Sequence, residues 1–290
     1  MNNKTFVDPQ VAEFINAHYI SIKINAEKDK GSELRKKYSV SGFPSVVFTT
    51  SDGSEVDRIV GFLPPLEYLK TARDYQANKN TLGDYQARLK TNPADIELNY
   101  EVGNKYAERG KFEQSRSYFK KVTDLDADNS SGKVDNAVFM SAILKFYQND
   151  KKGAATDLNA FIIKYPDSDV LNRAYKMLAN YYSSLNEPDN VVKTYRAAIK
   201  KFPEDKELHN AFAWFLAENN LHLDEALLVA KKAVALGPQD IAILDTLAEV
   251  YYKRKEYDSA IETITTAIRI EPDDDYLKKQ LGKFKQAQAK

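Results

Sequence analysis

Cysteine is absent from the 290 residues of this sequence. Without a thiol, these residues contain no disulfide, no cysteine nucleophile and no cysteine-based metal site. Reducing and oxidising compartments both tolerate cysteine-free proteins, so the absence does not identify a compartment. It does exclude dithiol chemistry carried by these residues alone.

An excess of charge of either sign is also absent, because 42 lysine and arginine residues balance 42 aspartate and glutamate residues. Proteins that bind nucleic acid or an anionic membrane usually have a basic excess, so the composition disfavours both partners. No apolar run approaches the roughly 20 residues that a membrane helix needs, and membrane insertion is not expected. The first residues, Met-Asn-Asn-Lys-Thr-Phe, lack the apolar stretch of a secretory signal.

Residues with the spacing of a catalytic or metal site are missing too. His18, His209 and His222 share no metal-ligand spacing, and the 11 glycines form no phosphate-binding loop. Carboxylates are abundant, but they alternate with lysine and arginine as on solvated helix faces. We therefore expect no catalytic residue, no cofactor and no metal ion in this chain.

What the sequence does contain is one pattern repeated five times between Ile96 and Pro272. Two columns of small residues recur in it, at intervals of 39, 37, 34 and 35 residues in the first column. The first column is Gly103, Ala142, Ala179, Ala213 and Ala248, and the second is Ser115, Ala154, Val191, Ala226 and Ala260, in which Val191 is the one exception. Helices that cross closely leave no room for large side chains, so this period predicts stacked helical hairpins.

The expected helix pairs are 96–108 with 112–125, 135–148 with 152–164, 170–184 with 189–201, 206–219 with 223–236, and 241–253 with 257–269. A final polar helix at 275–288 would cover the last exposed face. The pattern resembles the tetratricopeptide repeat, most clearly in Leu244…Leu247-Ala248…Tyr251…Tyr257…Ala260…Ile264…Ala267…Pro272. The resemblance implies a mostly α-helical chain with a tetratricopeptide-type α-α superhelix of about five repeats and a capping helix. It implies a partner that is a protein or an extended peptide.

The first 75 residues do not repeat. Their apolar pattern predicts helices at 8–18, 32–38 and 66–75 and strands at 19–24, 45–49 and 55–60. This order resembles an α/β thioredoxin-like domain, through Thr5-Phe6-Val7-Asp8…Val11…Phe14-Ile15-Asn16, Ile22 to Glu27 and Tyr38 to Pro44. The resemblance implies a cis peptide bond before Pro44 and a substrate-binding role for Phe43, Pro44 and Ser45.

The thioredoxin-like part is incomplete at its N-terminus. In relatives, a central strand and a Trp-Cys-x-x-Cys segment precede the position of Met1, and that strand lies between the strands equivalent to 19–24 and 45–49. Its absence would leave two strand edges with unpaired polar groups, each costing on the order of 1–3 kcal/mol if buried. Either the protein starts upstream or a truncated form repacks, and we favour the first. The expected domains are 1–75, a helical connector at 76–95, and the repeats with their capping helix at 96–290.

By analogy with the repeat family, fixed positions of each first helix face a peptide-binding groove. Aromatic rings there would supply contact area, and asparagines would bond an extended backbone. Trp214 is the strongest candidate, with packing inside its hairpin as the alternative role. The full set is Tyr100, Asn104, Phe139, Ile143, Lys176, Asn180, Ser183, Asn210, Trp214, Asp245, Glu249 and Tyr252.

Three functions remain open at this point. The cysteine-free sequence favours a non-catalytic scaffold that binds a partner protein in the repeat groove. A thiol–disulfide oxidoreductase of the thioredoxin family is the alternative, with its dithiol upstream and the repeats recruiting clients. Self-assembly through exposed strand edges is the third. The resemblance suggests a bacterial protein, periplasmic if a signal peptide precedes it and otherwise cytoplasmic.

Overall fold

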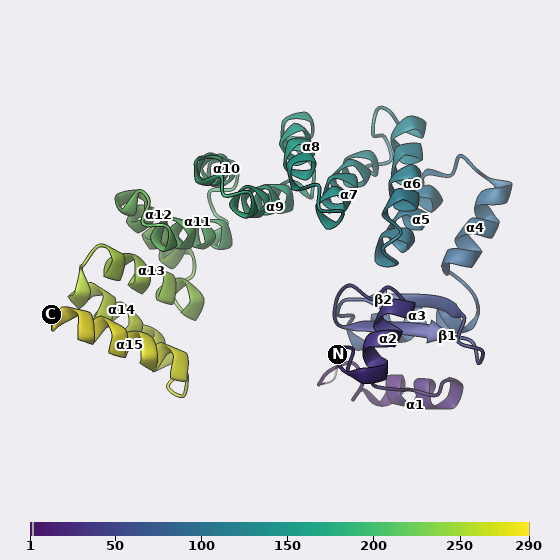
Figure 1. The fold of residues 1–290 in the computed structure, drawn as a ribbon, viewed down its shortest axis with the longest axis horizontal. Helices are drawn as coiled ribbons and strands as arrows, with labels where there is room; N and C mark the ends of the chain where they lie inside the picture. Colours follow the sequence, from purple (N-terminus) through teal and green to yellow (C-terminus); the bar gives the residue numbers. More distant parts are fainter. Residues whose placement is uncertain (2, 290) are drawn as a thin grey trace. The chain divides into compact units, whose positions relative to one another are not determined.

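The computed structural model describes residues 1 and 3–289, except for the side chain of Asp29, and is mostly helical (Figure 1). It divides into two compact units, Met1–Ala154 and Ala155–Lys290. The first unit holds the only sheet of the described residues, which is the two-stranded sheet formed by β1 and β2. The expected fold class, mostly α with a small α/β part at the N-terminus, is confirmed.

The N-terminal elements are α1 (Pro9–His18), α2 (Asp29–Lys37), β1 (Ser45–Thr49), β2 (Glu55–Val60), α3 (Pro65–Gln76) and α4 (Leu82–Thr91). Asp8 starts α1, because its side chain accepts hydrogen bonds from the backbone N–H groups of residues 10 and 11. β1 and β2 form an antiparallel hairpin whose turn includes Gly53, with φ at +80°. The hydrophobic core shared by α1, the hairpin and α3 consists of Val11, Phe48, Ile59, Tyr68, Leu69, Ala72 and Tyr75.

One predicted element is wrong: residues 19–24 do not form a strand. A strand needs a partner, and β1 pairs only with β2 among the described residues. The backbone N–H groups of residues 20–24 make no backbone hydrogen bond there. The segment lies at the surface, with Ile20 94% and Ile22 76% exposed. Water therefore reaches its polar groups, and the cost of a buried unpaired edge is avoided.

The repeats follow the sequence period closely. In the first unit the helices are α5 (Ile96–Glu108), α6 (Phe112–Leu125) and α7 (Val134–Tyr147), and α8 (Lys151–Lys164) contains the boundary between the units. The second unit continues with α9 (Leu171–Ser184), α10 (Pro188–Lys201), α11 (Lys206–Glu218), α12 (Leu223–Leu236), α13 (Ile241–Lys253), α14 (Tyr257–Ile270) and α15 (Asp275–Gln288). Each predicted pair is present within one or two residues of its expected limits.

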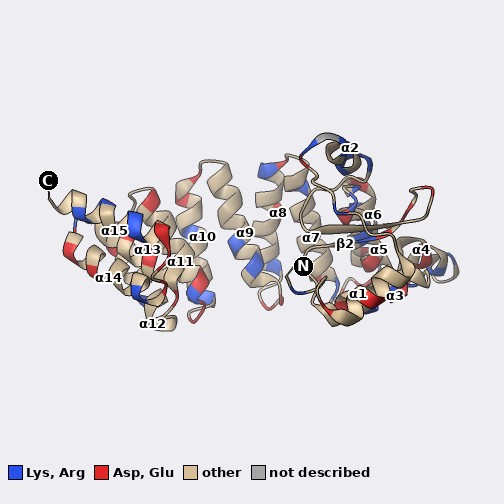
Figure 2. Ribbon diagram, turned by 90° about the horizontal axis from the view of Figure 1, so that it is seen from below, with Lys and Arg blue, Asp and Glu red and all other residues tan. Residues whose placement is uncertain are grey.

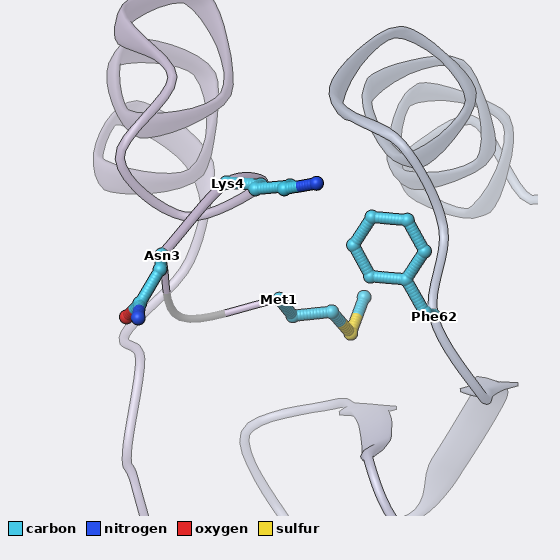
Figure 3. A pocket seen from close by; sticks show the side chains of 4 residues that line it. All are labelled: Met1, Asn3, Lys4 and Phe62. Atoms are coloured by element: carbon cyan, nitrogen blue, oxygen red, sulfur yellow. The ribbon is translucent and has the colours of Figure 1, made fainter. Parts of the chain in front are cut away.

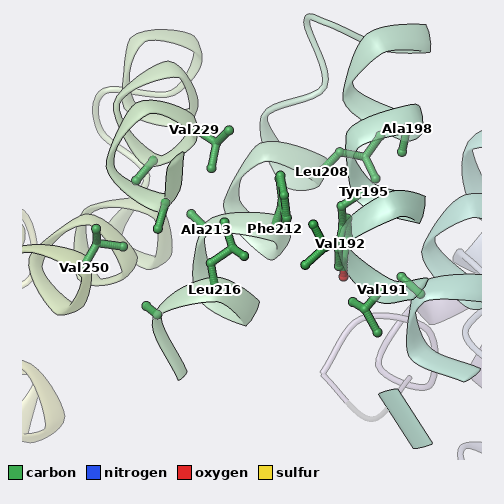
Figure 4. Packing of buried hydrophobic residues seen from close by; sticks show 14 of the residues in the cluster. Val191, Val192, Tyr195, Ala198, Leu208, Phe212, Ala213, Leu216, Val229 and Val250 are labelled. Carbon is green, nitrogen blue, oxygen red and sulfur yellow. The ribbon is translucent and has the colours of Figure 1, made fainter. Parts of the chain in front are cut away.

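The two small-residue columns lie where the helices touch. Every member of both columns is buried, and a Cβ atom on Gly103 would lie 2.6 Å from a ring carbon of Phe119 on α6. In the second unit the same packing builds a continuous apolar cluster from α9 to α13 (Figure 4). Phe212 and Leu216 on α11 contribute to it with side chains that are fully buried. Because each hairpin completes the core of its neighbour, the helices are stable only as a stack.

A buried cluster of charges joins the β-hairpin to the first repeat. Asp57 on β2 is fully buried, and its two carboxylate oxygens lie 3.0 Å from Lys105 Nζ and 2.9 Å from an Arg109 guanidinium nitrogen, both on α5. The same carboxylate accepts a 2.7 Å hydrogen bond from the backbone N–H of Leu82, at the start of α4. Arg58, the next residue on β2, donates to the backbone oxygen of Glu108. Three elements therefore meet at one carboxylate.

Glu108 is the unbalanced member of this cluster. Its Oε2 atom is buried and accepts no hydrogen bond from the described residues. Burial raises the pKa of its carboxyl from an ordinary value of 4.5 to about 7, and the nearby positive charge of Lys105 opposes the rise only in part. Ionisation of the Glu108 carboxyl therefore destabilises the folded first unit.

The contact of Gly103 with Phe119 predicts opposite effects of alanine at two helical glycines. Gly103→Ala should lower the free energy of unfolding by about 1–3 kcal/mol, because the new methyl group overlaps a ring that has no space to move. Gly282→Ala on α15 is the matched control, since a Cβ atom there meets nothing within 4 Å. It should gain up to about 1 kcal/mol of helix propensity. Urea unfolding followed by far-UV circular dichroism measures both, and equal effects would contradict the close approach.

Glu108 predicts a pH dependence of stability. Because its pKa is higher in the folded state, the folded protein retains a proton between about pH 4.5 and 7 that the unfolded chain releases, and stability falls as pH rises through this window. Glu108→Gln should therefore stabilise the first unit at pH 8 by up to about 3 kcal/mol and change little at pH 4. Glu67→Gln, at an exposed position on α3, is the control. A Glu108→Gln protein with the same pH profile as the parent would show that the carboxyl is solvated.

Candidate protein-binding surface

In the second unit, one lysine of the predicted groove is engaged in joining consecutive repeats. Lys176 on α9 lies 3.2 Å from Oδ2 of Asp205, which also accepts a 2.6 Å hydrogen bond from the side chain of Asn172. Asp205 caps α11 by accepting from the N–H of Leu208 at 2.8 Å. Burial opposes ionisation of Asp205, but these hydrogen bonds together hold its pKa below the usual range. A second lysine–aspartate contact joins the next two repeats, with Lys206 Nζ 2.8 Å from Asp240 Oδ2.

Four of the predicted groove residues remain available on α9 and α11. Asn180 and Ser183 on α9 are exposed, and Asn210 on α11 is half-buried. Trp214, one turn after Asn210, is 36% exposed, although its neighbours Phe212 and Ala213 are fully buried. The Oδ1 atom of Asn210 is buried without a hydrogen bond from the described residues. These four side chains, three polar and one large aromatic ring, are called the Trp214 surface below.

The last repeat presents a different face, because α15 covers it. Asp245 and Glu249 on α13 are 9% and 3% exposed, and both contact α15. Tyr276 Oη donates to Asp245 at 3.0 Å, and Lys283 Nζ lies 2.6 Å from a Glu249 carboxylate oxygen. Burial raises the pKa of Asp245. Both acids are thus occupied by the capping helix rather than open to a partner.

Tyr252, the third groove residue predicted on α13, is half-buried, and Lys283 Nζ lies 4.4 Å from the centre of its ring. This cation–π contact adds a second tie between α13 and α15. The capping helix expected from the sequence is therefore present, and it occupies the groove positions of the repeat before it.

The first unit places its predicted groove residues mostly in packed surroundings. Tyr100 and Asn104 on α5 are half-buried, and Lys133 Nζ lies 5.1 Å from the centre of the Tyr100 ring. Phe139 and Ile143 on α7 are 1% and 4% exposed. The expectation that these last two face a groove is not met, because α7 is apolar on several sides and buries them as core.

The thioredoxin-like part carries the residues expected at a peptide site. The bond between Phe43 and Pro44 is cis, as the resemblance implied. Phe43 is 58% exposed, and the Arg35 guanidinium lies 5.5 Å from the centre of its ring. Ser45 donates through its hydroxyl to the backbone oxygen of Gly42 at 2.7 Å. The geometry offers an exposed ring and a satisfied hydroxyl but no thiol.

A shallow pocket lies on the same part of the chain, lined by Met1, Asn3, Lys4 and Phe62. The Met1 side chain extends toward the Phe62 ring across it (Figure 3). Its lining contains one lysine and no carboxylate or histidine.

Basic and acidic residues are distributed over the helices of both units (Figure 2). Among the described residues, no group of histidine and acidic side chains is arranged to hold a metal ion. Among the described residues, no helix is long and apolar enough to span a membrane.

Comparison with known families agrees with this architecture. The family model of a thioredoxin-like domain matches residues 1–76. Four models of the tetratricopeptide repeat match residues 96–129, 136–168, 176–241 and 222–284. The chain is a thioredoxin-like domain followed by tetratricopeptide repeats. A comparison with curated proteins gave no match.

Solved structures show the same repeat fold at low sequence identity. A tetratricopeptide repeat protein from Parabacteroides merdae matches with a TM-score of 0.55 and 13% identity, over 67% of this chain and 73% of the other. YrrB, described as a tetratricopeptide repeat protein with an unusual peptide-binding site, matches with a TM-score of 0.52 and 18% identity. That match covers 69% of this chain and 97% of YrrB.

Proposed function

We propose that the repeats of this protein are a non-catalytic scaffold that binds an extended segment of a partner protein at the Trp214 surface. The exposure of Trp214 carries the proposal. Phe212 belongs to the apolar cluster from α9 to α13 and Phe215 packs against it, whereas Trp214 between them keeps 36% of its surface exposed. A tryptophan that is not buried in the core is well suited to anchor a partner, because on binding its rigid ring buries much area at little entropic cost.

The polar neighbours of Trp214 fit a peptide backbone. Asn180 and Ser183 are exposed on α9, and each side chain both donates and accepts hydrogen bonds. An extended backbone offers N–H and C=O groups in alternation, so amide and hydroxyl side chains can bond it without selecting a strict sequence. YrrB, which has a similar repeat fold and is described as having an unusual peptide-binding site, supports peptide binding by repeats of this kind.

The thioredoxin-like domain has a structural role in this proposal. The charge cluster around Asp57 fixes the β-hairpin on α5, and the cysteine-free sequence supplies no redox step. The domain then covers the start of the repeats, as α15 covers their end.

Trp214 is the only tryptophan in the sequence, so its fluorescence reports directly on binding at this surface. A random linear peptide library displayed on phage would be selected against the intact chain, and enriched peptides synthesised. We expect them to shift the tryptophan emission, and Trp214→Ala to weaken their binding by about tenfold or more, as for an interfacial hot spot.

Leu228→Ala is the matched control for this experiment, because Leu228 on α12 is a large apolar side chain that is 70% exposed. It should leave the affinity of the peptides unchanged. Peptides that bind without changing the emission of Trp214, and equally well to Trp214→Ala, would disprove the proposed surface.

A further inference from the structure

An open pocket of about 390 Å³ lies in the first unit, between the C-terminal end of α2 and the turn that joins α5 to α6. Two cationic side chains, three serines, Val40 and Gly110 line it, and no carboxylate does. Pockets for small molecules usually start at about 300 Å³, so its size is sufficient for one. None of the lining residues belongs to β1 or to residues 19–24, and the Trp214 surface lies in the other unit.

The two cations of this pocket are Arg35 and Lys36, in the last turn of α2. Neither forms an ion pair with a carboxylate among the described residues. Elsewhere in the first unit, Lys120 and Lys133 lie 2.7 Å and 3.0 Å from carboxylate oxygens. Two positive charges that share a pocket without a negative charge attract an anion from solution.

The Arg35 guanidinium is held in one orientation although it is exposed. Its Nε–H donates to the backbone oxygen of Val40 at 3.1 Å, and its central carbon lies 5.5 Å from the centre of the Phe43 ring. Its two terminal nitrogens donate no hydrogen bond among the described residues. A guanidinium fixed in this way can donate to two oxygens of one anion and loses little entropy when it does so.

Ser39 adopts a backbone conformation that favours glycine, with φ at +51°, directly after α2. It is the only serine with a positive φ among the described residues. Gly110 lies beside it, since a Cβ atom there would be 4.0 Å from the Ser39 Cβ. Compared with glycine, serine strains the backbone here, and what it adds is a hydroxyl in the pocket.

The end of α2 does not repel an anion through free carbonyl groups. The backbone oxygen of Lys36 accepts from the N–H of Ser39 at 3.1 Å, and that of Arg35 accepts from the N–H of Val40 at 2.9 Å. These two hydrogen bonds close the helix and satisfy carbonyls that would otherwise face solvent. The positive side chains therefore dominate the electrostatics of the pocket.

We propose that this pocket binds the phosphate group of a small molecule. Arg35 and Lys36 neutralise its charge, and the hydroxyls of Ser32, Ser39 and Ser41 donate to its oxygens. These hydroxyls make no hydrogen bond among the described residues, so all three are available as donors. A phosphate fits better than a carboxylate, because a phosphate monoester offers three strong acceptor oxygens and nearly two negative charges to this set of donors.

Titration of the isotope-labelled intact chain with inorganic phosphate, followed by its amide signals in NMR spectra, tests the proposal. The amide signals of Ser39, Ser41 and Gly110 should shift saturably, with a Kd on the order of 1 mM for so open a pocket. Arg35→Gln and Lys36→Gln should each weaken binding about tenfold, as expected when one charge-assisted hydrogen bond is lost.

Lys90→Gln is the matched control for the loss of one positive charge. Lys90 is also exposed in the last turn of a helix, α4, and has no ion pair among the described residues. Its replacement should leave phosphate binding unchanged. Ser39→Gly separates binding from folding, because glycine relieves the positive φ but removes the hydroxyl. It should raise the urea midpoint of unfolding and weaken phosphate binding about fivefold.

Glycerol phosphate and acetate, titrated in the same way, identify the ligand class. If glycerol phosphate binds more tightly than inorganic phosphate, the ligand is a phosphate ester, and the reverse order identifies the free ion. Both results support the proposal when the Arg35→Gln and Lys36→Gln proteins lose affinity. The proposal is overturned if no signal shifts saturably, if acetate binds as tightly as phosphate, or if Lys90→Gln weakens binding as much as Lys36→Gln does.

Discussion

The buried carboxylate of Asp57 is the constraint on which the N-terminal half of this protein depends. It forms ion pairs with Lys105 and Arg109 of α5 and accepts a hydrogen bond from the N–H of Leu82 at the start of α4. A carboxylate taken out of water is tolerated only when its oxygens are paired, and removing one partner of a buried pair costs about 3–5 kcal/mol. The hairpin, α4 and α5 therefore hold one relative arrangement, and the compact unit runs through Ala154 rather than ending with the thioredoxin-like part.

The helices were predictable because their signals are local. A column such as Ala213 and Ala248 marks where two helices approach, and the period of the columns gives the length of each hairpin. The strand predicted at 19–24 is wrong, because strand formation is not a local property. Its alternating isoleucines have the pattern of a strand, but strand formation depends on a partner edge, and β1 offers its hydrogen bonds only to β2. Alternating apolar residues show that a segment can form a strand, but the presence of a partner edge decides whether it does.

The candidate surface was harder to predict than the fold, because exposure depends on the neighbouring helix. Glu249 and Trp214 lie at equivalent positions, each directly after an alanine of the first small-residue column. Lys283 of α15 contacts Glu249, which is 3% exposed, whereas Trp214 stays 36% exposed. The charge cluster did leave a signal in the sequence. Leu98, Val102, Lys105 and Arg109 follow the spacing of one helical face, and all four are buried. Two cations on an apolar face require buried acids, and Asp57 is the acid that meets them.

The first unit deals with its polar groups in two opposite ways. At Asp57 the charges are buried and mutually satisfied, so the contact adds rigidity but offers nothing to a partner. In residues 20–24 the backbone stays in water, where its polar groups are satisfied but its isoleucines are not. The proposed partner surface therefore depends on Trp214 in the second unit, whose ring stays 36% exposed.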